Sequence, residues 1–123
     1  MLDNLGSRFQ EIFKKVRGHG KLSEFLEVST LLDYYKNLLS DKQREYLVNH
    51  FEEDLSLSEI AKNNNVSRQA VYDNIKRGIK LLKEYEEKLG FYEKDRELYG
   101  KLKELRDNFK VEKLDDILDS YFS

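Results

Sequence analysis

The sequence predicts an all-α protein with a helix-turn-helix unit between about Ser40 and Leu82, no winged helix, and additional C-terminal helices. Three observations predict this class. Apolar residues recur at spacings of three and four along most of the chain, which is typical of amphipathic helices. Proline is absent. Most of the six glycines fall where periodic segments end, at Gly18, Gly20, Gly90 and Gly100.

The first two expected helices cover residues 2–16 and 25–39. The first apolar stripe consists of Leu2, Leu5, Phe9, Ile12, Phe13 and Val16, and the glycine-containing segment 17–21 ends it. The second consists of Phe25, Val28, Leu31, Leu32, Tyr35, Leu38 and Leu39. Each stripe predicts that one side of its helix is buried.

Serine residues predict the starts of the next three helices. Ser40 and Ser56 each stand three residues before a Gln or Glu, which is the spacing of a capping box. We therefore expect one helix over 41–51 and a short helix after Ser56, with Ile60 and Ala61 on its inner side. Ser67 can cap a third helix that ends near Gly90.

The segment between the second and third capped helices favours a tight turn. Residues 63–65 are all asparagine, which tolerates left-handed backbone angles. The small Ala61 and the apolar Val66 would let the flanking helices cross closely, so that the second helix projects. That helix should bury Val71, Ile75, Ile79 and Leu82 on one side.

A projecting helix of this kind fits the major groove of DNA. On its first turns, Arg68, Gln69 and Tyr72 would reach base edges, because Arg suits guanine and Gln suits adenine. Further along, phosphate contacts are expected from Lys76, Arg77 and Lys80.

The alternative is a helix-turn-helix that serves only as a packing unit with a solvated polar side. Glu52, Glu53, Asp54 and Glu59 would repel phosphate if they lie on the same side as the basic residues. The formal net charge of −2 confines any basic surface to this local segment.

After Gly90 the sequence predicts two more helices. Their apolar positions are Leu98, Leu102, Leu105 and Phe109, then Val111, Leu114, Ile117, Leu118, Tyr121 and Phe122. A domain of this size does not readily bury such stripes alone, which points to helix exchange or a homodimer.

Composition argues for a binder and not an enzyme. No nucleophile motif or phosphate-binding loop is found, and the carboxylates stand in runs typical of solvated surfaces. We expect no cofactor and no metal site, since cysteine is absent and the two histidines, His19 and His50, lie far apart in sequence. The lack of an apolar span or secretory signal predicts a cytoplasmic protein without membrane insertion.

Two strings make the sequence similar to a known family. They are DLSLSEIA at Asp54–Ala61 and VSRQAVYDNIKR at Val66–Arg77, and both resemble the YlxM-like family. The region also resembles the fourth, DNA-binding region of bacterial sigma factors. The resemblance implies a bacterial cytosolic protein whose gene commonly neighbours those of the signal recognition particle, with an accessory or regulatory role in that pathway.

The first 24 residues depart from that family. They resemble the opening helix of the signal recognition particle GTPase, including its RGxGKL(S/T)E turn at Arg17–Glu24. The phosphate-binding loop of that GTPase is absent, so this segment predicts no GTP site. A natural fusion, a gene-boundary artefact and chance similarity all remain open. We therefore expect an N-terminal arm, 1–24, and a YlxM-like domain with its helical extension, 25–123.

Two functional hypotheses follow. The chain is either an accessory protein that binds signal recognition particle components, protein or RNA, or a sequence-specific DNA-binding regulator. A dependence on salt and on the recognition-helix side chains would distinguish them.

Overall fold

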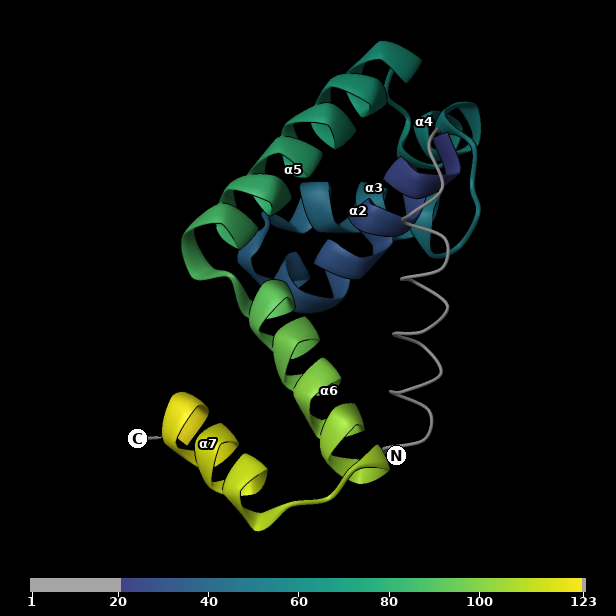
Figure 1. Ribbon diagram of the computed structural model, residues 1–123. Helices are drawn as coiled ribbons and strands as arrows, with labels where there is room; N and C mark the ends of the chain where they lie inside the picture. The colour runs from purple at the N-terminus through teal and green to yellow at the C-terminus, as the bar shows by residue number, and fades with distance from the viewer. Residues whose placement is uncertain (1–20, 123) are drawn as a thin grey trace. The chain divides into compact units, whose positions relative to one another are not determined.

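A computed structural model describes residues 21–122, with side chains from Glu24, and every regular element in that range is helical (Figure 1). The elements are α2 (Lys21–Tyr35), the 3-10 turn η1 (Lys36–Leu38), α3 (Asp41–Phe51), α4 (Leu57–Asn64), α5 (Arg68–Leu89), α6 (Phe91–Asp107) and α7 (Val111–Phe122). The predicted all-α fold without a wing is confirmed for these residues. The first predicted helix, residues 2–16, lies outside them.

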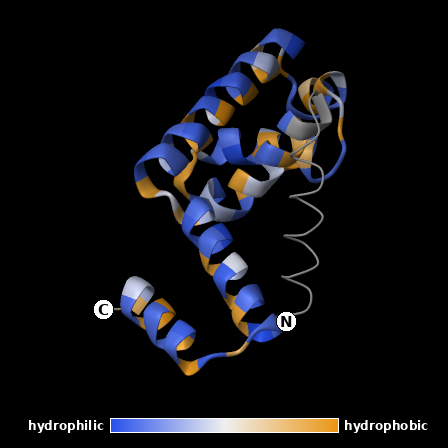
Figure 2. Ribbon diagram, in the orientation of Figure 1, coloured by the Kyte–Doolittle hydropathy of each residue, from blue (hydrophilic) through white to orange (hydrophobic). Residues whose placement is uncertain are grey.

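The chain divides into two compact units, with the boundary between Gly90 and Phe91. In the first unit, α5 packs against α2, α3 and α4. Figure 2 shows the apolar sides of these helices turned toward one another and a polar side of α5 turned outward. The largest fully buried side chains come from all four helices and are Val28, Leu32, Tyr35, Leu47, Ile60, Val71 and Leu82.

The three predicted serine caps are confirmed. Ser40 and Ser56 each form a complete capping box, accepting the amide of the third helical residue while that residue's side chain accepts the serine amide. Ser67 starts α5, and its Oγ accepts the N–H of Ala70 at 3.0 Å. Because these hydrogen bonds are local, the sequence alone predicted the start of α3 at Asp41, and the end expected at about residue 51 is also confirmed.

The predicted helix over 25–39 differs from the observed one at both ends. The α-helix α2 begins at Lys21 and stops at Tyr35, and the 3-10 turn η1 continues to Leu38. The boundary predicted after residue 24 therefore lies within α2. Leu38 is 53% exposed although it was placed on the apolar stripe, because the tighter 3-10 turn rotates it out of the register of the α-helix.

Two of the residues predicted to shape the turn and the helix ends behave differently from the prediction. Gly100 was placed at a helix end, but it lies inside α6. Val66 was named with Ala61 as a residue that lets the two helices cross closely, but it is 40% exposed. Gly90 does end α5, with a left-handed φ of 63°, and Ala61 is buried as predicted.

The second unit is a helical hairpin of α6 and α7. Leu105 of α6 and Ile117 of α7 are its buried large apolar side chains among the residues that the structure describes. Lys113 Nζ lies 3.1 Å from Glu104 Oε1 and joins the two helices at the surface. Both helices that the sequence predicted after Gly90 are therefore confirmed.

Candidate nucleic-acid interface

The turn between α4 and α5 has the geometry of a helix-turn-helix. Asn65 adopts a left-handed conformation, with φ 53° and ψ 44°, at the C-terminal end of α4. Its N–H donates to the carbonyl of Lys62 at 3.3 Å, and the N–H of Val66 donates to that of Ala61 at 3.0 Å. These bonds satisfy carbonyls at the end of α4, and Ser67 then starts α5 two residues later.

The predicted phosphate-binding side chains are all exposed on α5. Lys76, Arg77 and Lys80 make no ion pair with any residue in the range 21–122, and neither does Arg68. Their positive charges are therefore available to an anionic partner. The arrangement is compatible with the predicted role, which stays a prediction.

Positions along α5 place two neighbouring rows of side chains on its solvent side. Residues four apart share one side of a helix. Arg68, Tyr72, Lys76 and Lys80 form the first row by this spacing, and Tyr72 is 46% exposed. The first row spans three helical turns, about 18 Å at roughly 1.5 Å per residue.

The second row consists of Gln69, Asp73 and Arg77, and in it Gln69, the predicted adenine reader, already has a hydrogen-bond partner. Gln69 Nε2 donates to Asp73 Oδ1 at 2.9 Å, and both residues are exposed. Gln69 must release this carboxylate before its amide can pair with a base edge. The four-residue spacing of the two side chains was the signal for this contact, and the sequence interpretation did not use it.

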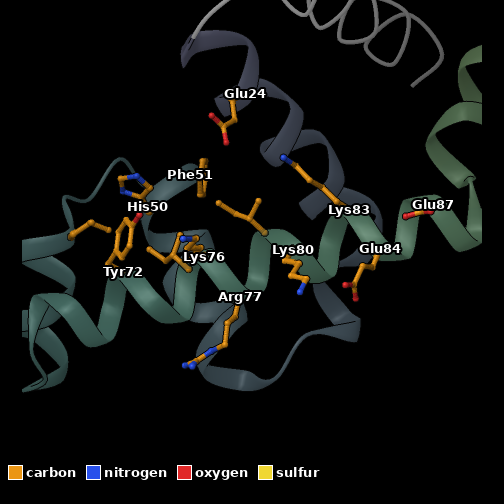
Figure 3. A pocket seen from close by; sticks show the side chains of 13 residues that line it. Glu24, His50, Phe51, Tyr72, Lys76, Arg77, Lys80, Lys83, Glu84 and Glu87 are labelled. Atoms are coloured by element: carbon orange, nitrogen blue, oxygen red, sulfur yellow. The ribbon is translucent and has the colours of Figure 1, made fainter.

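A groove of about 850 Å³ follows one flank of α5, entirely within the first unit (Figure 3). The residues that line it are Glu24, His50, Phe51, Leu57, Tyr72, Ile75, Lys76, Arg77, Ile79, Lys80, Lys83, Glu84 and Glu87. Figure 3 shows Lys83 directed toward α2 and Arg77 directed away from it. Four predicted interface residues thus border an apolar depression.

The groove was not predicted from the sequence. Its opposite wall comes from residues of α2, α3 and α4, which lie outside α5, so periodicity within α5 does not reveal it. The one local signal is Ile79, which belongs to the predicted apolar side of α5 yet is only half-buried because it borders the groove.

His50 in the groove wall has a defined hydrogen-bond partner. Its Nδ1 lies 2.8 Å from the carbonyl oxygen of Leu55, so Nδ1 is protonated and donates. His19, the other histidine, lies outside the described residues. Between residues 21 and 122, no group of three or more His, Asp or Glu side chains is placed to hold a metal ion.

The acidic residues near α4 fall into two sets. Glu59 Oε1 accepts the N–H of Ser56 at 3.2 Å, so this carboxylate is held at the N-terminus of α4 as part of the cap. There it is stabilised by the helix dipole. Glu52, Glu53 and Asp54 are exposed where α3 ends and the loop to α4 begins. They remain the acidic side chains that would oppose a phosphate nearby.

None of the helices within residues 21–122 combines the length and the apolar character that a bilayer crossing requires.

Comparison with known proteins identifies the family. The UPF0122 family, helix-turn-helix proteins described as YlxM / p13 like, matches residues 22–119. A UPF0122 protein of Fusobacterium nucleatum is 57% identical over 99 residues, which cover 80% of this chain and 96% of that protein. A UPF0122 protein of Halalkalibacterium halodurans is 48% identical over 89 residues, 70% of this chain and 82% of that relative. The helix-turn-helix geometry and these matches agree, and the chain belongs to the UPF0122, YlxM-like family.

Proposed function

We propose that this protein is an accessory or regulatory component of the signal recognition particle pathway and that it binds its partner through the exposed side of α5. The pathway is suggested by the family resemblance. The binding surface is suggested by one observation, the row of cations on α5 that form no ion pair within the described residues 21–122. We propose a binding role, without a catalytic step.

The first row on α5 suits an RNA or another extended anionic surface. Arg68, Lys76 and Lys80 place three positive charges along one helix, and Tyr72 lies among them with an exposed ring. Cations pair with phosphates, and an exposed aromatic ring can stack on an unpaired base. Within the signal recognition particle, RNA is therefore the partner that this surface favours.

A second candidate function is sequence-specific DNA binding. The observation that favours it is the position of Arg68 and Gln69 on the first turn of the second helix of a helix-turn-helix. In that position side chains contact base edges in a major groove. The two candidates use the same residues and differ in their partner.

Fluorescence anisotropy distinguishes the candidates. Labelled signal recognition particle RNA, the reconstituted RNA–GTPase particle and a random DNA duplex are titrated with the full-length protein at two salt concentrations. We expect tighter binding to the RNA and the particle than to the duplex. Stronger binding to the duplex, collapsing at high salt, would instead support the DNA-binding candidate.

Single substitutions test whether α5 is the interface. We expect Arg68→Ala and Lys76→Ala to weaken binding, and Lys76→Ala to reduce the slope of log affinity against log salt by about one. Lys88→Ala is the matched control, because it removes the same charge from α5 about 18 Å further along the axis than Lys76. If all three variants bind like the wild type, the α5 assignment is wrong.

A further inference from the structure

We propose that the α6–α7 hairpin is a homodimerisation surface and that its occupant is the same hairpin of a second copy. The observation is a group of large apolar side chains left in solvent. Leu102, Phe109, Val111, Leu118 and Phe122 have exposed fractions of 43%, 63%, 57%, 47% and 71%. Soluble monomers seldom expose several large apolar residues within one short segment.

Four of these side chains lie on α6 or α7 next to the buried seam of the hairpin, and Phe109 lies in the loop between the two helices. Val111, Leu118 and Phe122 are seven and four residues apart, so they line one side of α7. That side neighbours the one with buried Ile117. On α6, Leu102 stands three residues before buried Leu105 and lies on the same side. Figure 2 shows apolar positions on both helices of the hairpin.

The size of the hairpin argues that it needs a partner. Residues 91–123 form the second compact unit, and domains below about 40 residues usually require a disulfide, a metal or oligomerisation. The chain has no cysteine to form a disulfide. Two copies of the hairpin would assemble into four helices around a shared apolar core, which is a common stable arrangement.

Charge complementarity favours a second copy of the hairpin as the partner. It also indicates which helices of the two copies are in contact. α7 carries one cation, Lys113, and four carboxylates, Glu112, Asp115, Asp116 and Asp119. Residues 101–110 contain four cations, Lys101, Lys103, Arg106 and Lys110, against two carboxylates. Like charges would oppose an α7–α7 contact, whereas segment 101–110 of one copy, the C-terminal part of α6 and the loop after it, attracts α7 of the other. In a dimer with a two-fold axis this contact occurs twice, because each copy presents the same surface to the other.

Sedimentation equilibrium of the full-length protein tests the dimer. We expect a dimeric mass for the wild type and a shift toward monomer for Leu118→Glu, which places a charge in the apolar surface. Ser120→Glu is the matched control, because it adds the same charge to another side of α7 and should leave the mass dimeric. Far-ultraviolet circular dichroism shows whether each variant keeps its helices.

Cross-linking tests the pairing without relying on a disruptive substitution. The cysteine-free chain allows Leu102→Cys and Leu118→Cys to be prepared separately, oxidised alone and oxidised as a mixture. We expect more disulfide-linked dimer in the mixture than in either variant alone. A monomeric wild type at all concentrations, or a dimer that Leu118→Glu does not weaken, would overturn the proposed surface. Equal cross-linking alone and in the mixture would overturn the α6–α7 pairing.

Discussion

Gly78 of α5 faces Leu47 of α3 so closely that a β-carbon on Gly78 would lie 2.6 Å from Leu47 Cδ1. Leu47 is fully buried, so its side chain has little room to turn aside. The two helices cross closely at this point because Gly78 has no side chain. This contact fixes how α5, and with it the candidate interface, sits on the rest of the first unit.

Gly78→Ala should therefore destabilise the protein. Alanine favours a helix over glycine by about 1 kcal/mol, while overpacking a core costs roughly 1 to 3 kcal/mol. We expect a net loss of about 1 kcal/mol in the free energy of unfolding, and a larger loss for Gly78→Val. Urea denaturation followed by circular dichroism measures the change.

Gly100→Ala is the matched control for that substitution. Gly100 also lies within a helix, α6, but a β-carbon there would meet no atom of the described residues 21–122 within 4 Å. The same exchange should raise the stability of α6 by about 0.5 to 1 kcal/mol. If Gly78→Ala stabilises the protein as much as Gly100→Ala does, Leu47 does not restrict the contact.

These two glycines illustrate what the sequence could and could not predict. The starts of α3, α4 and α5 depend on hydrogen bonds between residues three apart, so Ser40, Ser56 and Ser67 revealed them. The role of Gly78 depends on Leu47, which is distant in sequence, and the groove likewise depends on residues of α2, α3 and α4. Helical periodicity predicted the rows on α5. Whether their side chains already have ion-pair or hydrogen-bond partners could be seen only in the folded structure.

Asn65 provides a test of the turn between α4 and α5. A left-handed backbone costs residues other than glycine about 1 to 2 kcal/mol, and asparagine tolerates it better than most. We expect Asn65→Ala to lower the free energy of unfolding by about 1 kcal/mol and Asn65→Gly to change it by less than about 0.5 kcal/mol. Chemical denaturation of both variants checks this order.

Asn63→Ala is the control for the loss of an asparagine side chain. Asn63 is exposed within α4, where alanine is the better helix former. Its replacement should be neutral or slightly stabilising. An equal loss of stability at both positions would show that the left-handed conformation of Asn65 is not what the sequence requires.

The contact between Gln69 and Asp73 predicts a gain in nucleic-acid affinity when the carboxylate is removed. At about 8 Å in water, a carboxylate and a phosphate repel each other by roughly 0.5 kcal/mol, and Asp73→Asn removes this repulsion. It also weakens the hold on the Gln69 amide. We expect at least about twofold tighter binding to a nucleic acid at low salt. Anisotropy titration measures it.

A second substitution tests whether the gain in affinity depends on where the carboxylate is removed. Glu87→Gln removes an exposed carboxylate from α5 about 21 Å further along the axis than Asp73 and should leave the affinity for nucleic acid unchanged at moderate salt, where distant charges are screened. Equal gains from both variants would indicate a general effect of net charge. Weaker binding by Asp73→Asn would mean that the carboxylate positions Gln69 for its partner.

The hydrogen bond between Tyr35 and Glu86 should stabilise the C-terminal end of α5. Tyr35 is fully buried, and its hydroxyl donates to Glu86 Oε1 at 2.6 Å. Hydrogen bonds to charged groups contribute about 1.5 to 3 kcal/mol, so Tyr35→Phe should lower the free energy of unfolding by an amount in that range. Tyr85→Phe removes a hydrogen bond of 3.2 Å from a more accessible hydroxyl to the Leu38 carbonyl, and about 0.5 to 1 kcal/mol is expected. Urea denaturation of both variants measures the difference, and equal losses would show that neither burial nor the charge of Glu86 strengthens the Tyr35 bond.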